Sequence, residues 1–148
     1  TALEFVTGSS ASTALNDLSD VTASGAAQGD VLYYNGSGWV LQNGPVIRWT
    51  IGNNGASDYT FSGPGFPSAK NDPVLYLMRG HTYVFVNTTG TNHPFEIRVS
   101  NGGSPYTSGL SGSQSGTQSF TVPMDAPSTL YYQCTIHGGM GNTINIVS

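Results

Sequence analysis

Apolar side chains recur along the second part of the chain in short runs that are separated by turn-forming residues. The runs cover residues 46–51, 59–61, 74–77, 82–87, 95–99, 117–122, 129–134 and 143–147. None of them keeps a helical period over three turns, and short apolar runs between Gly-, Pro- and Asn-rich turns are typical of β-strands. The pattern therefore predicts an antiparallel β-sandwich or barrel.

The run at residues 82–87 differs from the others because apolar residues occupy both of its faces. Val84 and Val86 alternate with Tyr83 and Phe85. Successive residues of a strand point to opposite faces, so this strand needs cover on both sides. It is predicted to lie centrally in the fold.

A stretch dominated by Ser and Gly, residues 101–116, interrupts the series of strands. Its low complexity favours a mobile surface loop. The alternative is a contact loop for a partner, because loops on a rigid sandwich often carry recognition. The sequence leaves both interpretations open.

Residues 1–44 are predicted to form a separate segment, and residues 45–148 to form the main domain. Within the first segment, the β-prone runs 31–34 and 39–41 flank an Asn-Gly pair, which tolerates the positive φ of a hairpin turn. A lone hairpin is marginally stable, so it is expected to pack on the rest of the chain or on copies of itself. The chain also begins abruptly near a Ser/Thr/Ala stretch, as a piece of a longer protein would.

Composition and charge narrow the classes of function. Only 8% of residues are charged, the net charge is -4, and the four basic residues are scattered singly. The basic residues therefore form no clustered patch of the kind that binds nucleic acid. No apolar run approaches the roughly 18 residues of a membrane span. The sequence carries no P-loop, HExxH, Ser-His-Asp or paired-carboxylate pattern, so we expect no nucleic-acid binding, no membrane insertion and no enzymatic activity.

The clearest candidate chemistry lies near the C-terminus. Cys134, His137 and Met140 stand as Cys-x-x-His-x-x-Met, and His93 lies well upstream in Asn-His-Pro-Phe. Taken alone, a single cysteine on a strand is more often a small buried apolar residue than a ligand. Together, a thiolate, two imidazoles and a weak thioether are the donor set of a type 1 copper centre, which serves both Cu(I) and Cu(II). Zinc is the less favoured alternative, since one Cys and two His suit it as well.

The loop between residues 134 and 141 is short enough to bring its side chains together. Its glycines supply the backbone freedom that a tight return requires. His93 would then come from the end of another strand and close the site. Because two distant segments would share one ion, metal binding is expected to stabilise the fold.

The stretch Cys134-Thr-Ile-His137-Gly-Gly-Met140 resembles the ligand loop of the cupredoxins, with the spacing of the shortest loops in that family. The upstream stretch from Leu75 to Phe95 is similar to the cupredoxin pattern of strand, Gly turn and strand before the first histidine ligand. The resemblance covers residues 46–148. It implies an all-β, cupredoxin-like Greek-key β-sandwich with an N-terminal β-hairpin appendage. It also implies that His93, Cys134 and His137 are the strong copper ligands and that Met140 is the weak axial one.

The same resemblance gives a role to Asn92, and two features depart from it. Asn92, just before the first ligand, is expected to brace the cysteine loop, whereas His81 is off the motif and is interpreted as a surface histidine. Electron-transfer cupredoxins usually present an apolar patch around the exposed C-terminal histidine. Here the patch is reduced to Ile136 beside two glycines, which weakens the case for a redox partner docking there.

A second resemblance concerns the N-terminal segment. Its stretches 15–21 and 29–40 resemble a module of bacteriophage tail-fibre proteins, which are usually homotrimers. The resemblance implies a copper-binding cupredoxin-like domain of a viral tail-fibre structural protein, located in the virion. Such a protein would trimerise through its N-terminal segment and could face a host-surface receptor. The alternatives are a secreted or periplasmic type 1 copper electron-transfer protein, and a cupredoxin-like adhesion domain with no metal.

Overall fold

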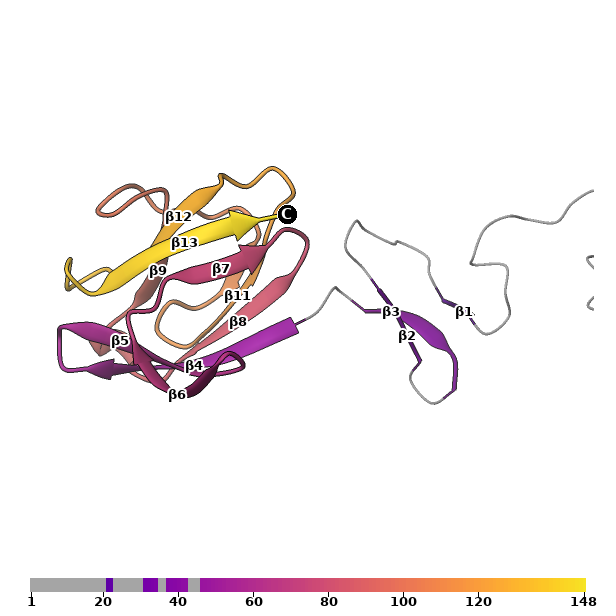
Figure 1. The fold of residues 1–148 in the computed structure, drawn as a ribbon, viewed down its shortest axis with the longest axis horizontal. Helices are drawn as coiled ribbons and strands as arrows, with labels where there is room; N and C mark the ends of the chain where they lie inside the picture. The colour runs from indigo at the N-terminus through magenta and orange to yellow at the C-terminus, as the bar shows by residue number, and fades with distance from the viewer. Residues whose placement is uncertain (1–20, 23–30, 35–36, 43–45) are drawn as a thin grey trace, which may run out of the picture. The chain divides into compact units, whose positions relative to one another are not determined.

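The structure, a computed structural model, describes residues 21–22, 31–34, 37–42 and 46–148. The chain divides into two compact units, residues 1–42 and residues 43–148, and each is described by itself. The described residues form strands β1 to β13 and one 3-10 turn, η2 (Figure 1). Among them, no helix has the length and apolar character needed to span a bilayer.

The N-terminal unit contains a three-stranded sheet. Strands β2 (Val31–Tyr34) and β3 (Trp39–Gln42) pair antiparallel, with Tyr34 opposite Trp39. The predicted hairpin is therefore confirmed, although its Asn-Gly pair lies outside the described residues. Strand β1 (Val21–Thr22) adds a parallel pairing to β3 that the sequence did not predict.

The second unit is a sandwich of two sheets that face each other in Figure 1. The six-stranded sheet has the order β10-β11-β8-β4-β5-β6 and the other has the order β7-β13-β12-β9. The six-stranded sheet consists of β4 (Val46–Asn54), β5 (Asp58–Gly63), β6 (Phe66–Asn71), β8 (Thr82–Asn87), β10 (Leu110–Gly112) and β11 (Thr117–Thr121). The four-stranded sheet consists of β7 (Leu75–Met78), β9 (Phe95–Arg98), β12 (Thr129–Cys134) and β13 (Gly141–Val147). The all-β sandwich with an N-terminal hairpin is as predicted.

The sheets are mixed rather than purely antiparallel, which corrects the prediction. Strand β4 runs parallel to β8, and β13 runs parallel to β7. Parallel neighbours need long connections, and here each connection passes through other strands of the sandwich. Hydrophobic alternation reports which residues face the core, but it does not report the direction of the neighbouring strand.

Strands β6 and β10 were not predicted, and both lie at an edge of the six-stranded sheet. Their side chains are largely exposed, so they carry little apolar signal. Pro67 in β6 is also typical of an edge strand, because its missing N–H would break a central ladder. The Ser/Gly-rich stretch is therefore a strand-containing segment rather than an irregular loop.

The same segment is hydrogen-bonded to the body of the sandwich. The Tyr106 N–H donates to the carbonyl of Ile97 over 2.8 Å. The carbonyl of Gln114 accepts from the Phe95 N–H at 2.9 Å and from Asn87 Nδ2 at 2.8 Å. The segment is thus fixed beside the strand that follows His93.

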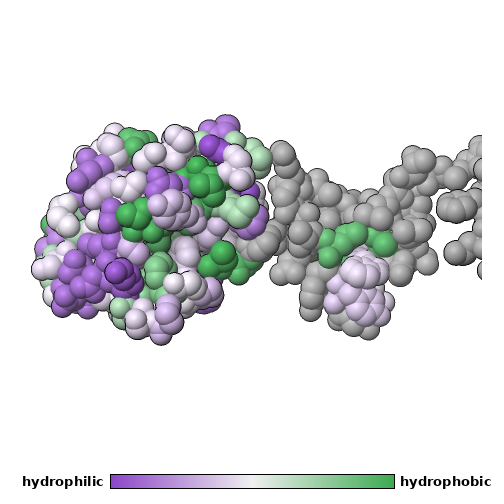
Figure 2. Space-filling view, viewed as in Figure 1, coloured by the Kyte–Doolittle hydropathy of each residue, from purple (hydrophilic) through white to green (hydrophobic). Residues whose placement is uncertain are grey.

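An aromatic cluster fills the space between the sheets. Phe85 and Phe95 have ring centroids 4.9 Å apart, and Tyr132 stacks on Phe95 at 5.4 Å. Strand β8 lies between β11 and β4, which confirms its predicted central position. Apolar side chains that remain outside are seen as separate spots on the face shown in Figure 2.

Candidate metal centre

His93 follows η2 (Gly90–Asn92) and precedes β9. Its carbonyl oxygen accepts hydrogen bonds from Asn87 Nδ2 at 2.8 Å, Thr89 Oγ1 at 3.1 Å and the Tyr59 hydroxyl at 3.1 Å. The whole His93 residue is only 8% exposed. Side chains from β5, β8 and the turn after β8 thus fix the backbone that carries this ring.

Cys134 ends β12, where it is paired in register with Phe95 of β9. This pairing places the thiol beside the segment that carries His93, although the two residues are 41 positions apart. The Cys134 residue is 2% exposed and makes no disulfide. Strand pairing, rather than any local motif, brings the two ligand segments together.

The loop after Cys134 is closed by its own backbone. The Cys134 N–H donates to the Met140 carbonyl at 2.9 Å, and the Met140 N–H donates to the His137 carbonyl at 3.0 Å. The Gln133 side chain adds a short hydrogen bond from Nε2 to the carbonyl of Gly138. Met140 is fully buried at the end of this loop.

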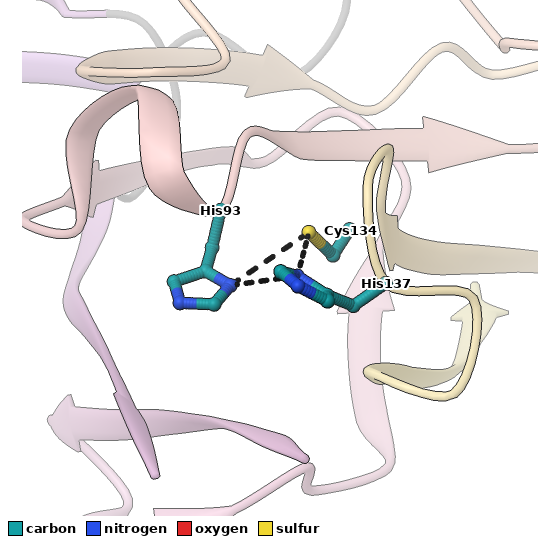
Figure 3. Close-up of side chains that lie close together, drawn as sticks. All are labelled: His93, Cys134 and His137. Atoms are coloured by element: carbon teal, nitrogen blue, oxygen red, sulfur yellow. Dashed lines mark hydrogen bonds between the residues drawn. The ribbon is translucent and has the colours of Figure 1, made fainter. Parts of the chain in front are cut away.

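The side chains of His93, Cys134 and His137 point toward one another (Figure 3). The two Nδ1 atoms are 3.1 Å apart, and Cys134 Sγ lies 3.5 Å from His137 Nδ1 and 4.0 Å from His93 Nδ1. A point equidistant from three atoms with these separations lies about 2.1 Å from each. Zinc binds His nitrogen at about 2.0–2.1 Å and Cys sulfur at about 2.3 Å, so one ion of this size class fits between the donors.

The charge state of His93 also suits a ligand site. Burial of His93, and secondarily the neighbouring His137, lowers the pKa of the His93 imidazole. A lowered pKa keeps the ring neutral, which leaves a nitrogen lone pair available for a metal. The other ring nitrogen, Nε2, lies 3.4 Å from the side-chain amide of Asn53, so a polar group faces the side of the ring away from the cluster.

The structure therefore brings three of the four predicted ligands together and buries the fourth, Met140, at the end of the same loop. Asn92, which was expected to brace the cysteine loop, is exposed. The segment after it reaches that loop instead through the Pro94 carbonyl, which accepts from the Thr135 N–H at 3.2 Å. His81 lies apart from the cluster, with Nδ1 3.2 Å from the Arg79 carbonyl. Sequence reasoning placed Asn87 only at the end of the central strand and did not predict that its side chain holds the His93 carbonyl.

Comparison with known proteins gives structural neighbours only. No protein-family model matches the chain, and a search of curated proteins found no relative. Rusticyanin from Thiobacillus ferrooxidans is 20% identical, with 81% of this chain and 88% of that chain covered and a TM-score of 0.42. Another structure of rusticyanin, described there as a copper protein, is 22% identical, with coverages of 81% and 89% and a TM-score of 0.38.

A multicopper oxidase variant from Aquifex aeolicus is also similar, at 18% identity and a TM-score of 0.39. The match covers 72% of this chain and 27% of the oxidase. The case for a metal rests on the donor set of this chain, one thiol and two imidazole nitrogens around one point, on a two-sheet β-sandwich.

Proposed function

We propose that residues 46–148 form a type 1 copper domain that carries single electrons. The observation that supports this most strongly is the convergence of His93 Nδ1, His137 Nδ1 and Cys134 Sγ at mutual separations of 3.1–4.0 Å. Two imidazoles and one thiolate in a trigonal arrangement, with a weak axial thioether, are typical of blue-copper electron-transfer sites. Copper in such a site supplies one-electron exchange between Cu(I) and Cu(II).

The protein's part is to hold these donors in one geometry. Three hydrogen bonds fix the His93 carbonyl, and the return of the loop fixes Cys134 relative to Met140. Ligands that are held this way need not rearrange when the oxidation state changes. Met140, which is buried at the end of the loop, would supply the weak fourth donor.

We propose a carrier rather than an enzyme. A catalytic metal site keeps an open position for substrate, whereas Cys134 and His93 are almost fully buried. His137 is only half-buried and stands beside Ile136, which is 59% exposed. Electrons would then enter and leave at the His137 edge, and an electron carrier of this kind would function in the periplasm or outside the cell.

Copper titration tests this proposal. Purified protein titrated with Cu(II) should develop an intense thiolate-to-copper band near roughly 600 nm, as ligation by one thiolate and two imidazoles predicts. Cys134→Ser should abolish the band, and His81→Gln, which alters a histidine outside the cluster, should retain it. A colourless wild-type complex would contradict the blue-copper assignment and favour zinc. Absence of reversible reduction at a positive potential would contradict the electron-carrier role.

A second candidate, a tail-fibre structural protein, is favoured by one observation on the N-terminal unit. Tyr34 and Trp39 are 51% and 42% exposed, and their ring centroids lie 5.4 Å apart on a small sheet. Aromatic side chains on a small hairpin gain burial if copies of the unit pack together, as in a homotrimer. In that protein the metal would stabilise a virion component that could face a host receptor. A strictly monomeric full chain in solution would contradict this candidate.

A further inference from the structure

We propose that Asp72 is a positioning residue that joins the end of the ligand loop to the segment carrying His93. This inference rests on the proposed copper site. Asp72 lies between β6 and β7, away from both ligand segments in the sequence. Among the described residues it is the only non-glycine residue with positive φ, at 33°.

The Asp72 carboxylate bonds to two distant backbone amides. Its Oδ1 accepts from the Tyr59 N–H at 2.9 Å, and its Oδ2 accepts from the Gly141 N–H at 3.0 Å. These partners are 13 and 69 positions away, whereas an aspartate that only caps its own turn bonds to residues two or three positions on. The carboxylate therefore connects two strands, β5 and β13, rather than completing a local turn.

The backbone of Asp72 makes two further bonds to the same strands. Its N–H donates to the Tyr59 carbonyl at 2.8 Å, and its carbonyl accepts from Asn142 Nδ2 at 2.7 Å. All four hydrogen bonds thus go to Tyr59 or to the pair of residues that follows Met140. A non-glycine residue in a strained conformation persists only where its surroundings over-determine it, and these bonds do so.

Gly141 is the point at which this contact acts on the ligand loop. It follows Met140 directly, and its φ is 145°. A Cβ at this position would lie 2.1 Å from the Tyr132 carbonyl, so β13 approaches β12 too closely here for any side chain. The Asp72 carboxylate fixes the N–H of this glycine and hence the place where the loop ends.

Tyr59 carries the connection to the other ligand segment. Its hydroxyl lies 3.1 Å from the His93 carbonyl and 2.9 Å from the Pro94 carbonyl, and its ring packs edge-on against Phe95 at 5.4 Å. The path Gly141–Asp72–Tyr59–His93 therefore spans both sides of the site without using the ligand side chains. Burial raises the pKa of the Asp72 carboxyl, while the N–H groups of Gly141 and Tyr59 lower it, so both hydrogen bonds compensate a carboxylate that is costly to bury.

Two substitutions test this role. Asp72→Asn keeps one acceptor oxygen but replaces the other with an NH₂ donor, so only one of the two backbone N–H groups can still be accepted. Asp72→Gly removes the side chain and tolerates the positive φ, so backbone strain does not prevent folding. Asp125→Asn is the matched control, because Asp125 is an exposed carboxylate and its replacement changes the net charge equally.

The readouts are the Cu(II) affinity and the charge-transfer spectrum of the full chain. Loss of a group that orients metal ligands typically weakens metal affinity by about 10–100-fold, so both Asp72 variants should bind Cu(II) at least about tenfold more weakly and show a shifted band. Asp125→Asn should match the wild type. Wild-type affinity and spectrum in both Asp72 variants would overturn the inference, even if their melting temperatures fall.

A wild-type protein without a charge-transfer band would contradict the proposed function separately. In that case, amide hydrogen exchange on the metal-free protein tests whether Asp72 positions the loop. Both Asp72 variants should speed exchange at the N–H groups of Cys134 and Met140, which close the loop, more than at core strands. A uniform loss of protection, or none, would overturn the positioning role.

Discussion

The sandwich and the N-terminal unit are both made of β-strands, but they differ in how they bury apolar side chains. In the sandwich, Phe61, Phe85 and Phe95 are completely buried between two sheets. In the N-terminal unit, Tyr34 and Trp39 remain about half exposed on a small sheet. Burial of apolar area is the main favourable term in folding, so the sandwich can be stable by itself, whereas the hairpin needs a further surface.

The largest effect expected from this comparison follows truncation of an aromatic residue in each unit. Phe95→Ala should lower the free energy of unfolding of the sandwich by about 3–5 kcal/mol, because it removes a ring that packs on Phe85 and Tyr132. Trp39→Ala should change that free energy by less than about 0.5 kcal/mol, as exposed substitutions usually do. Urea unfolding followed by circular dichroism measures both, and equal losses would contradict the division into a self-sufficient and a dependent unit.

Bound copper should widen the difference in stability between the two units, because the proposed ligands all lie in the sandwich. A ligand that binds only the folded state at about 100 times its dissociation constant adds about 2.7 kcal/mol of stability. Thermal unfolding with and without Cu(II) should show this increment for the wild type and for His81→Gln. Cys134→Ser should show none, and a copper-induced increment that survives this substitution would place the ion elsewhere.

The strands and ligands that the sequence predicted share one property: each is marked by a pattern within a short stretch of the chain. Strand β8 is marked by its own alternation, and the three C-terminal ligands are marked by their spacing. Edge strands β6 and β10 escaped prediction because their side chains face solvent and form no apolar run. The direction of β4 and β7 relative to their neighbours escaped prediction for a different reason, since parallel pairing depends on the route of the chain.

The residues that hold the site could not be predicted, because their contacts are distant in sequence. Tyr59 reaches His93 across 34 positions, and Asp72 reaches Gly141 across 69. Tyr59 has the pattern of an ordinary core aromatic, and Asp72 that of an ordinary turn aspartate. Only the folded arrangement shows that both contact the segments that carry the ligands.

A smaller effect is expected from pH, again confined to the sandwich. Burial lowers the pKa of His93 below its ordinary value of 6.5, so the unfolded chain binds a proton more readily than the folded one. The folded state is therefore favoured fully above pH 6.5, where His93 is neutral in both states. As the pH falls from 6.5 toward the folded-state pKa, the free energy of unfolding should decrease by at most about 1.4 kcal/mol per pH unit.

Urea unfolding of the metal-free protein between pH 5 and pH 8 measures this slope. His93→Gln removes the titrating group and should flatten it, whereas His81→Gln should leave it unchanged. An unchanged slope in His93→Gln would assign the pH dependence to other groups.

The smallest effect on stability should come from removing the N-terminal unit altogether. A chain of residues 43–148 retains every contact described for the sandwich and its metal site, so its free energy of unfolding should stay within about 0.5 kcal/mol of the full chain. What should change is the state of association. Analytical ultracentrifugation should show self-association of the full chain, through the exposed rings of Tyr34 and Trp39, and a monomer after truncation. If both chains are monomeric, copies of the hairpin do not cover one another, and the tail-fibre candidate loses the observation that favours it.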